Sequence, residues 1–306
     1  MKRVTPMLPA IIVVAAAATL FASRPQRTFK GGIEAVRLDV SVTRGGLPVS
    51  GLSAADFAVT DNDVLQQIEV LADPLPVAVV LVLDTSGSVA GERLSHLVKA
   101  ATTLVGALHA GDRAALMTFS HDVNLRLPLT ADVNRLTNAL NSLAGRGQTA
   151  VRDAVYAALQ LAPEDESRPV VLLFSDGRDN ASWLSVQHTL TAARRAGVVI
   201  HAVSLREQQP AELVQPGRPA PVQPEAAPTF VDELVNAAGG RHWQTTASAD
   251  LQPLFIRALD EMRARYLLMF YPQGVRREGW HDLKVTLKRA RGTITVRPGY
   301  FVPNPG

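Results

Sequence analysis

Two segments of the chain place acidic and hydroxyl side chains directly after long apolar runs. Asp84-Thr85-Ser86-Gly87-Ser88 follows the apolar residues 77–83, and Ser175-Asp176-Gly177 follows residues 170–174. Carboxylate and hydroxyl oxygens are hard ligands, which suit Mg²⁺, Mn²⁺ or Ca²⁺ better than softer metals. Ligands of open parallel sheets bind in the crevice outside the carboxyl ends of the strands. We therefore predict a divalent-cation site where the two segments meet.

The first segment, taken alone, has other interpretations. Asp, Ser and Gly dominate turns, so the segment can simply end a strand. Its D-T-S-G also resembles the D-T-G of aspartic proteases, but those need two carboxylates that share a proton, and the chain holds no second copy. A phosphatase of the haloacid dehalogenase type requires another Asp where Ser86 stands. Neither enzyme class is favoured.

A third segment, Gly145-Arg146-Gly147-Gln148-Thr149, is a Gly-rich loop that delivers a Thr at the start of a helical pattern. Together the three segments resemble the metal-ion-dependent adhesion site of the von Willebrand factor type A family, which also occurs in integrin inserted domains. The resemblance covers about residues 77–264. It implies bound Mg²⁺ (or Mn²⁺ or Ca²⁺), with hydroxyl ligands from Ser86, Ser88 and Thr149, and with Asp84 and Asp176 binding directly or through water.

The same resemblance implies a binding function. A protein partner that presents Asp or Glu replaces a water on the metal, so we expect cation-dependent adhesion or complex assembly at the cell envelope. We do not expect an enzyme, because the sequence shows no evident general base, no H-E-x-x-H, no G-x-S-x-G and no P-loop. Two alternatives stay open: a structural or interaction domain that works without metal, and a metal-assisted hydrolase.

Residues 77–264 alternate apolar strand patterns with amphipathic helix patterns. This order predicts an α/β domain with a doubly wound, mostly parallel sheet, of the von Willebrand factor A-like, Rossmann type. Residues 207–228, which contain several prolines, interrupt the pattern and are expected to form a surface loop. His201 falls inside a strand and is expected to be a satisfied core residue. Asp122 and Asp179 are expected to be charges at the rim of the site.

Short β patterns flank this domain on both sides. In residues 31–73, apolar residues at 36, 38, 40 and 42 alternate with polar ones, and residues 265–306 carry a similar signal. Fragments of this size bury little core alone, so we expect them to pair into one β-sandwich. Asp61-Asn62-Asp63 is expected to be a turn. Short phrases such as Arg297-Pro298-Gly299-Tyr300 are similar to those of exported bacterial proteins related to von Willebrand factor A.

The composition and the N-terminal residues limit the kinds of binding partner and the cellular location that we expect. The chain has 306 residues, of which 47% are hydrophobic, and 31 basic against 28 acidic residues give a net charge of +3, so we expect no nucleic-acid binding. Cys is absent, which excludes disulfides and thiolate chemistry. Lys2 and Arg3 precede the apolar residues 7–22, so residues 1–23 are expected to be a signal peptide or a membrane anchor. We expect an exported protein, periplasmic, secreted or anchored, with membrane contact only through that anchor.

Overall fold

The computed structural model describes residues 35–71, 75–163, 165–176, 178–206, 229–276 and 278–303. The chain separates into two units, Met1–Ile33 and Glu34–Gly306, and all described residues belong to the second. The expected signal or anchor segment and all of the Pro-rich residues 207–228 lie outside the described residues. Within the described residues, no helix is both long and apolar enough to cross a membrane.

The central part is a six-stranded sheet in the order β11-β10-β9-β6-β7-β8, in which only the edge strand β8 runs antiparallel to its neighbour. The strands are β6 (Val77–Asp84), β7 (Arg113–Phe119), β8 (Val123–Thr130), β9 (Arg168–Ser175), β10 (Val199–Leu205) and β11 (His242–Thr245). All residues of β6 are buried, as its continuous apolar run predicts for a strand covered on both faces.

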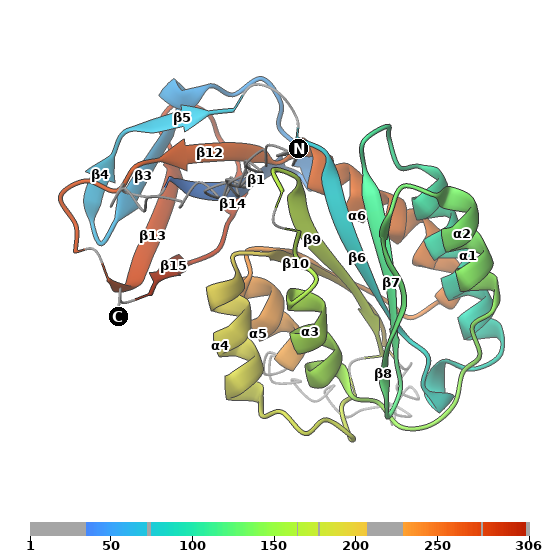
Figure 1. Cartoon of the computed structure of the whole chain (residues 1–306). Coiled ribbons are helices and arrows are strands. Elements are labelled where there is room, and N and C mark those ends of the chain that lie inside the picture. Colours follow the sequence, from blue (N-terminus) through green and yellow to red (C-terminus); the bar gives the residue numbers. More distant parts are fainter. Residues whose placement is uncertain are drawn as a thin grey trace, which may run out of the picture. The chain divides into compact units, whose positions relative to one another are not determined.

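Helices cover both faces of this sheet (Figure 1). Buried side chains of α1 (Glu92–Gly106), α2 (Val133–Asn141) and α6 (Leu251–Ala264) pack on one face. Those of α3 (Val151–Leu159), α4 (Val186–Ala196) and α5 (Phe230–Ala237) pack on the other. The expected doubly wound α/β fold is confirmed.

Two further sheets combine strands from both ends of the chain (Figure 1). Their facing side chains form a separate core. One sheet has the order β14-β1-β12-β5, with β2 paired to β1, and the other has the order β15-β13-β3-β4. The strands are β1 (Val36–Arg44), β2 (Leu47–Pro48), β3 (Phe57–Asp61), β4 (Val64–Gln66), β5 (Ile68–Val70), β12 (Tyr266–Phe270), β13 (Gly279–Leu287), β14 (Thr293–Thr295) and β15 (Gly299–Val302). The sandwich of N- and C-terminal strands in the expected fold class is therefore present.

Candidate metal site

The first candidate ligand is the last residue of β6. The Asp84 carboxylate accepts a hydrogen bond of 2.8 Å from the Ser86 N–H, which turns the chain back on itself directly after the strand. This turn places the hydroxyl oxygens of Ser86 and Ser88 3.0 Å apart. The short helix η2 (Gly87–Val89) follows. The alternating Asp, Ser and Ser thus present their oxygens together.

The neighbouring strand β9 brings the second carboxylate to the same place. Because β6 and β9 are parallel partners, their carboxyl ends meet at one edge of the sheet. The Ser175 hydroxyl donates to Asp84 Oδ2 over 3.3 Å, and the Ser88 hydroxyl donates to Asp176 Oδ2 over 2.5 Å. Side-chain hydrogen bonds therefore connect four of the predicted ligands: Asp84, Ser86, Ser88 and Asp176.

Thr149 reaches this edge through backbone contacts. The Gly147 carbonyl accepts from the Gly87 N–H over 2.9 Å, and the Arg146 N–H donates to the Thr85 carbonyl over 2.8 Å. Thr149 itself is buried, and its hydroxyl has no hydrogen-bond partner among the described residues. The structure therefore joins the Thr149 loop to the turn after β6, but no side-chain hydrogen bond joins Thr149 to the other predicted ligands within the described parts of the chain.

The electrostatics of Asp84 test whether these residues fit a cation. Burial raises the pKa of Asp84 to about 6, hydrogen bonds from Ser86 oppose the rise, and the nearby Asp176 carboxylate adds to it. The main causes of this pKa shift include no Lys, Arg or His side chain. A buried carboxylate next to a second carboxylate fits a bound divalent cation.

The donor set is also suitable in kind, since two carboxylates and three hydroxyls are all hard oxygen ligands. The described residues contain no group of three or more His, Cys, Asp and Glu side chains that could hold a metal. The candidate site therefore depends on its Ser and Thr hydroxyls as well as on its two carboxylates.

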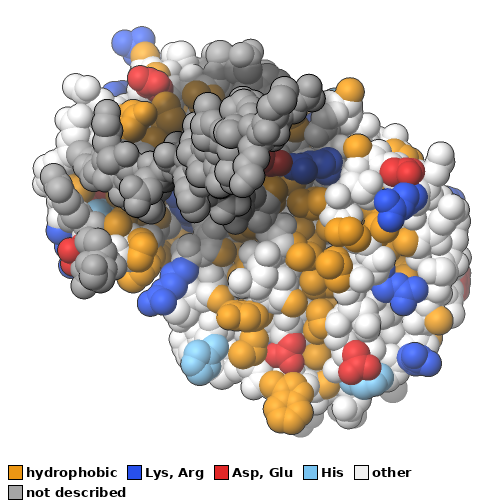
Figure 2. Space-filling model, in the orientation of Figure 1, with side chains coloured by type: hydrophobic (Ala, Val, Ile, Leu, Met, Phe, Trp, Pro, Cys, Tyr) orange, Lys and Arg blue, Asp and Glu red, His pale blue; other side chains and the backbone are white. Residues whose placement is uncertain are grey.

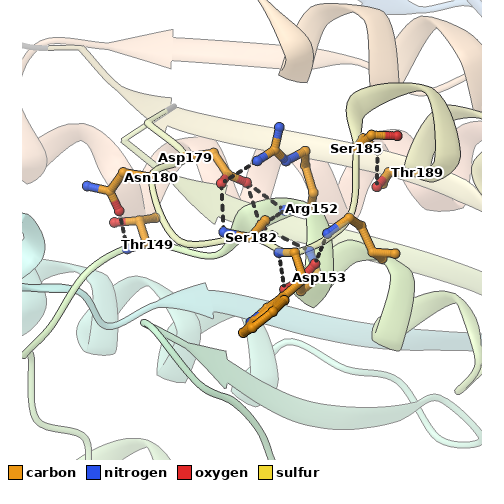
Figure 3. A network of polar contacts seen from close by, with 10 residues as sticks. Thr149, Arg152, Asp153, Asp179, Asn180, Ser182, Ser185 and Thr189 are labelled. Atoms are coloured by element: carbon orange, nitrogen blue, oxygen red, sulfur yellow. Dashed lines mark hydrogen bonds and ion pairs between the residues drawn. The ribbon is translucent and has the colours of Figure 1, made fainter.

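The two expected rim charges have different roles. Asp122 pairs at the surface with His121 Nε2 over 3.1 Å. Asp179 instead accepts from the Arg152 N–H over 2.9 Å and from the Ser182 hydroxyl over 2.7 Å (Figure 3). Arg152 stands in the first turn of α3, whose N-cap residue Ala150 has no side chain to cap it. Asp179 and Ser182 supply that cap, a function the sequence does not reveal.

The buried Ser204 of β10 lies beside the half-buried His242 and Asp232. His242 Nε2 is 2.7 Å from the Ser204 hydroxyl, and His242 Nδ1 is 2.6 Å from Asp232 Oδ1. This order of groups is that of a nucleophile, a base and an orienting acid. Ser204 is only 4% exposed, however, so a substrate cannot reach its hydroxyl in this conformation. The arrangement ties α5 and β11 to β10.

Several solved structures are similar to this chain. A von Willebrand factor type A structure from Catenulispora acidiphila is 14% identical over 84% of this chain and 76% of that chain, with a TM-score of 0.51. An aerotolerance-related membrane protein from Bacteroides fragilis is 17% identical over 60% of this chain and 99% of that chain, with a TM-score of 0.46. Proximal thread matrix protein 1 from the mussel byssus, with a zinc-occupied MIDAS motif, is 18% identical over 65% of this chain and 49% of that chain, with a TM-score of 0.49.

The family model described as von Willebrand factor type A domain matches residues 79–178, a range that contains all of the predicted metal ligands. The central part of this chain therefore has a von Willebrand factor type A-like α/β fold.

Proposed function

We propose that the protein is a divalent-cation-dependent protein-binding module, which acts in adhesion or complex assembly. Von Willebrand factor type A domains typically mediate protein interactions and adhesion. The observation that carries the cation dependence is the pair of carboxylates, Asp84 and Asp176, which are linked through Ser86 and Ser88.

In this proposal Asp84, Ser86, Ser88, Thr149 and Asp176 hold the cation, with Mg²⁺ first and Mn²⁺ or Ca²⁺ as alternatives. The bound cation supplies an open position for a carboxylate oxygen. The partner is therefore a protein that presents Asp or Glu. Arg146, an exposed residue of the Gly-rich loop, adds positive charge that attracts such a partner.

We assign no catalytic residue. The described Lys and Arg side chains are scattered over the face shown in Figure 2, which gives no support to a nucleic-acid partner. The basic and apolar start of the sequence supports export, to the periplasm, to the medium or to the outer side of a membrane.

A chelator-sensitive pull-down from envelope extract tests the proposal. The full chain should retain a partner in Mg²⁺, lose it in EDTA and regain it when Mg²⁺ is added back. Asp84→Asn should retain no partner, whereas Asp260→Asn, which changes an exposed carboxylate of α6, should behave as the wild type. Retention that EDTA and Asp84→Asn leave unchanged would contradict cation dependence and favour the metal-independent interaction domain.

A further inference from the structure

Trp183 stands on the loop between Asp176 and α4, and its side chain is 96% exposed. No other large hydrophobic side chain among the described residues is as exposed. A Trp ring combines a large apolar area with a polar N–H, and no described residue accepts a hydrogen bond from this indole. At such exposure the ring contributes little to the packing of the chain, so the fold does not explain a Trp at this position.

The backbone that carries Trp183 is firmly held. The two oxygens of the Asp153 carboxylate accept from the N–H groups of Trp183 and Leu184, over 2.9 and 3.0 Å. One residue earlier, the Ser182 hydroxyl donates to Asp179 and accepts from the Arg152 N–H over 3.1 Å (Figure 3). A side chain on a fixed backbone loses less conformational entropy when a partner binds it. The loop therefore presents the apolar Trp183 side chain on a backbone that needs little further ordering when a partner binds.

The same network connects Trp183 to the candidate metal site. The Asn180 side chain accepts from the Thr149 N–H over 2.8 Å (Figure 3). The Thr149 carbonyl accepts from the N–H groups of Asn180 and Ala181. Asp153 follows Thr149 by four residues, so their Cα atoms are at most about 15 Å apart. An extended peptide covers that span with about five residues.

We propose that Trp183 is a second anchor of the partner-binding surface, beside the cation. The partner segment then carries an aliphatic or aromatic side chain within about six residues of its metal-binding Asp or Glu. A polypeptide supplies both groups at this spacing, and Trp is enriched among residues that dominate protein–protein affinity. The inference rests on the proposed function, because the acidic residue of the segment is the one that meets the cation.

Selection of phage-displayed random peptides on the full chain in Mg²⁺ tests the inference. The wild type should select peptides that combine an acidic residue with a nearby apolar one. Trp183→Ala should select for the acidic residue alone and bind a wild-type-selected peptide about 30-fold more weakly. Calorimetric heats of Mg²⁺ binding should be the same for both proteins, which excludes damage to the metal site.

Leu65→Ala is the matched control, since Leu65 is an exposed apolar residue of β4 in the sandwich, and this variant should select the same peptides as the wild type. Equal affinity of the wild type and Trp183→Ala for the selected peptide would overturn the inference. Selection by the wild type of acidic peptides without a nearby apolar residue would overturn the inference as well, while leaving the proposed function intact. Peptides that bind equally without Mg²⁺, or equally to Asp84→Asn, would overturn the proposed function itself.

Discussion

The Asp84 carboxylate is buried at the end of β6, with Asp176 as its charged neighbour, so the metal-free protein holds two negative charges at one edge of the sheet. Removing one of these charges should stabilise the metal-free protein. A pKa raised from 3.8 to about 6 corresponds to a cost on the order of 2–3 kcal/mol at neutral pH.

Asp84→Asn is therefore expected to raise the Tm of the protein in EDTA and to abolish the rise in Tm that Mg²⁺ causes in the wild type. Thermal unfolding with and without Mg²⁺ measures both effects. A lower Tm in EDTA for the variant would show that the charge is already compensated, which contradicts the electrostatic account of the site.

Asp112 illustrates the opposite case, a carboxylate that stabilises the fold. Burial alone would raise its pKa, but hydrogen bonds from the Val77 N–H, the Arg263 guanidinium and the His109 N–H outweigh burial and lower the pKa. Because the folded pKa is depressed, this stabilisation is present above the unfolded pKa of about 3.9 and is lost as the pH falls through the folded pKa.

Asp112→Asn should thus cost about 2 kcal/mol at pH 7, and the difference from the wild type should shrink below about pH 4. Denaturant unfolding across this pH range provides the test, with the exposed Asp260→Asn as control. A difference that does not change with pH would mean that the charge of Asp112 is unimportant.

Among the connecting elements, the Gly-rich loop determines whether Thr149 lies at the metal edge. Gly147 has a φ of +83°, and a Cβ there would lie 2.5 Å from His121 Nδ1. Its carbonyl also accepts the hydrogen bond from Gly87. A side chain at this position strains the backbone that connects the loop to the turn after β6.

We expect Gly147→Ala to weaken Mg²⁺ binding about tenfold and to cost about 1–2 kcal/mol of stability. Gly106→Ala is the control, because its added Cβ meets no atom within 4 Å apart from its chain neighbours and its own helix backbone, and the residue ends α1. Calorimetry and denaturant unfolding give the two quantities. Unchanged Mg²⁺ affinity in Gly147→Ala would show that the loop does not position a ligand.

The sequence predicts those elements whose burial pattern is regular. The uninterrupted apolar residues of β6 and β9 identify buried parallel strands, and the polar residues after them identify the candidate site. The alternation in β1 identifies the sandwich. The edge strand β8 escaped prediction because its exposed Asn124 and Arg126 give it no clear apolar pattern, and β11 is too short to show one.

The sequence also does not predict which buried polar side chains contact one another, because these contacts join segments that lie far apart in the chain. The turn at Asn62 and Asp63 was expected, and both residues have positive φ. The preceding Asp61, however, is buried and binds His281 over 2.8 Å and the Tyr300 hydroxyl over 2.7 Å. His201 was expected to be satisfied, and this was wrong in part: its Nδ1 accepts from the Arg241 N–H, but its buried Nε2 has no partner among the described residues.

At the scale of the whole molecule, a nearly buried ion pair joins the sandwich to the α/β domain. Arg168, the first residue of β9, donates from Nε to Asp39 of β1 over 2.9 Å. The carbonyl of Asp39 also accepts from Arg265 over 2.8 Å. Removing one member of a buried pair leaves an uncompensated charge, which typically costs 3–5 kcal/mol.

Arg168→Met should therefore destabilise the protein by about 3 kcal/mol, and adding Asp39→Asn should recover part of that loss. A double-mutant cycle measured by denaturant unfolding gives the coupling energy. Additive effects within about 0.5 kcal/mol would mean that the pair does not couple the two parts.

Calorimetric titration of Mg²⁺ and Mn²⁺ into the full chain tests the central claim most directly. The account predicts saturable binding by the wild type and by Ser95→Ala, which changes an exposed Ser of α1, and loss of that binding in Ser86→Ala and Thr149→Ala. Equal heats from the wild type, Ser86→Ala and Thr149→Ala would contradict a metal site built from these hydroxyls.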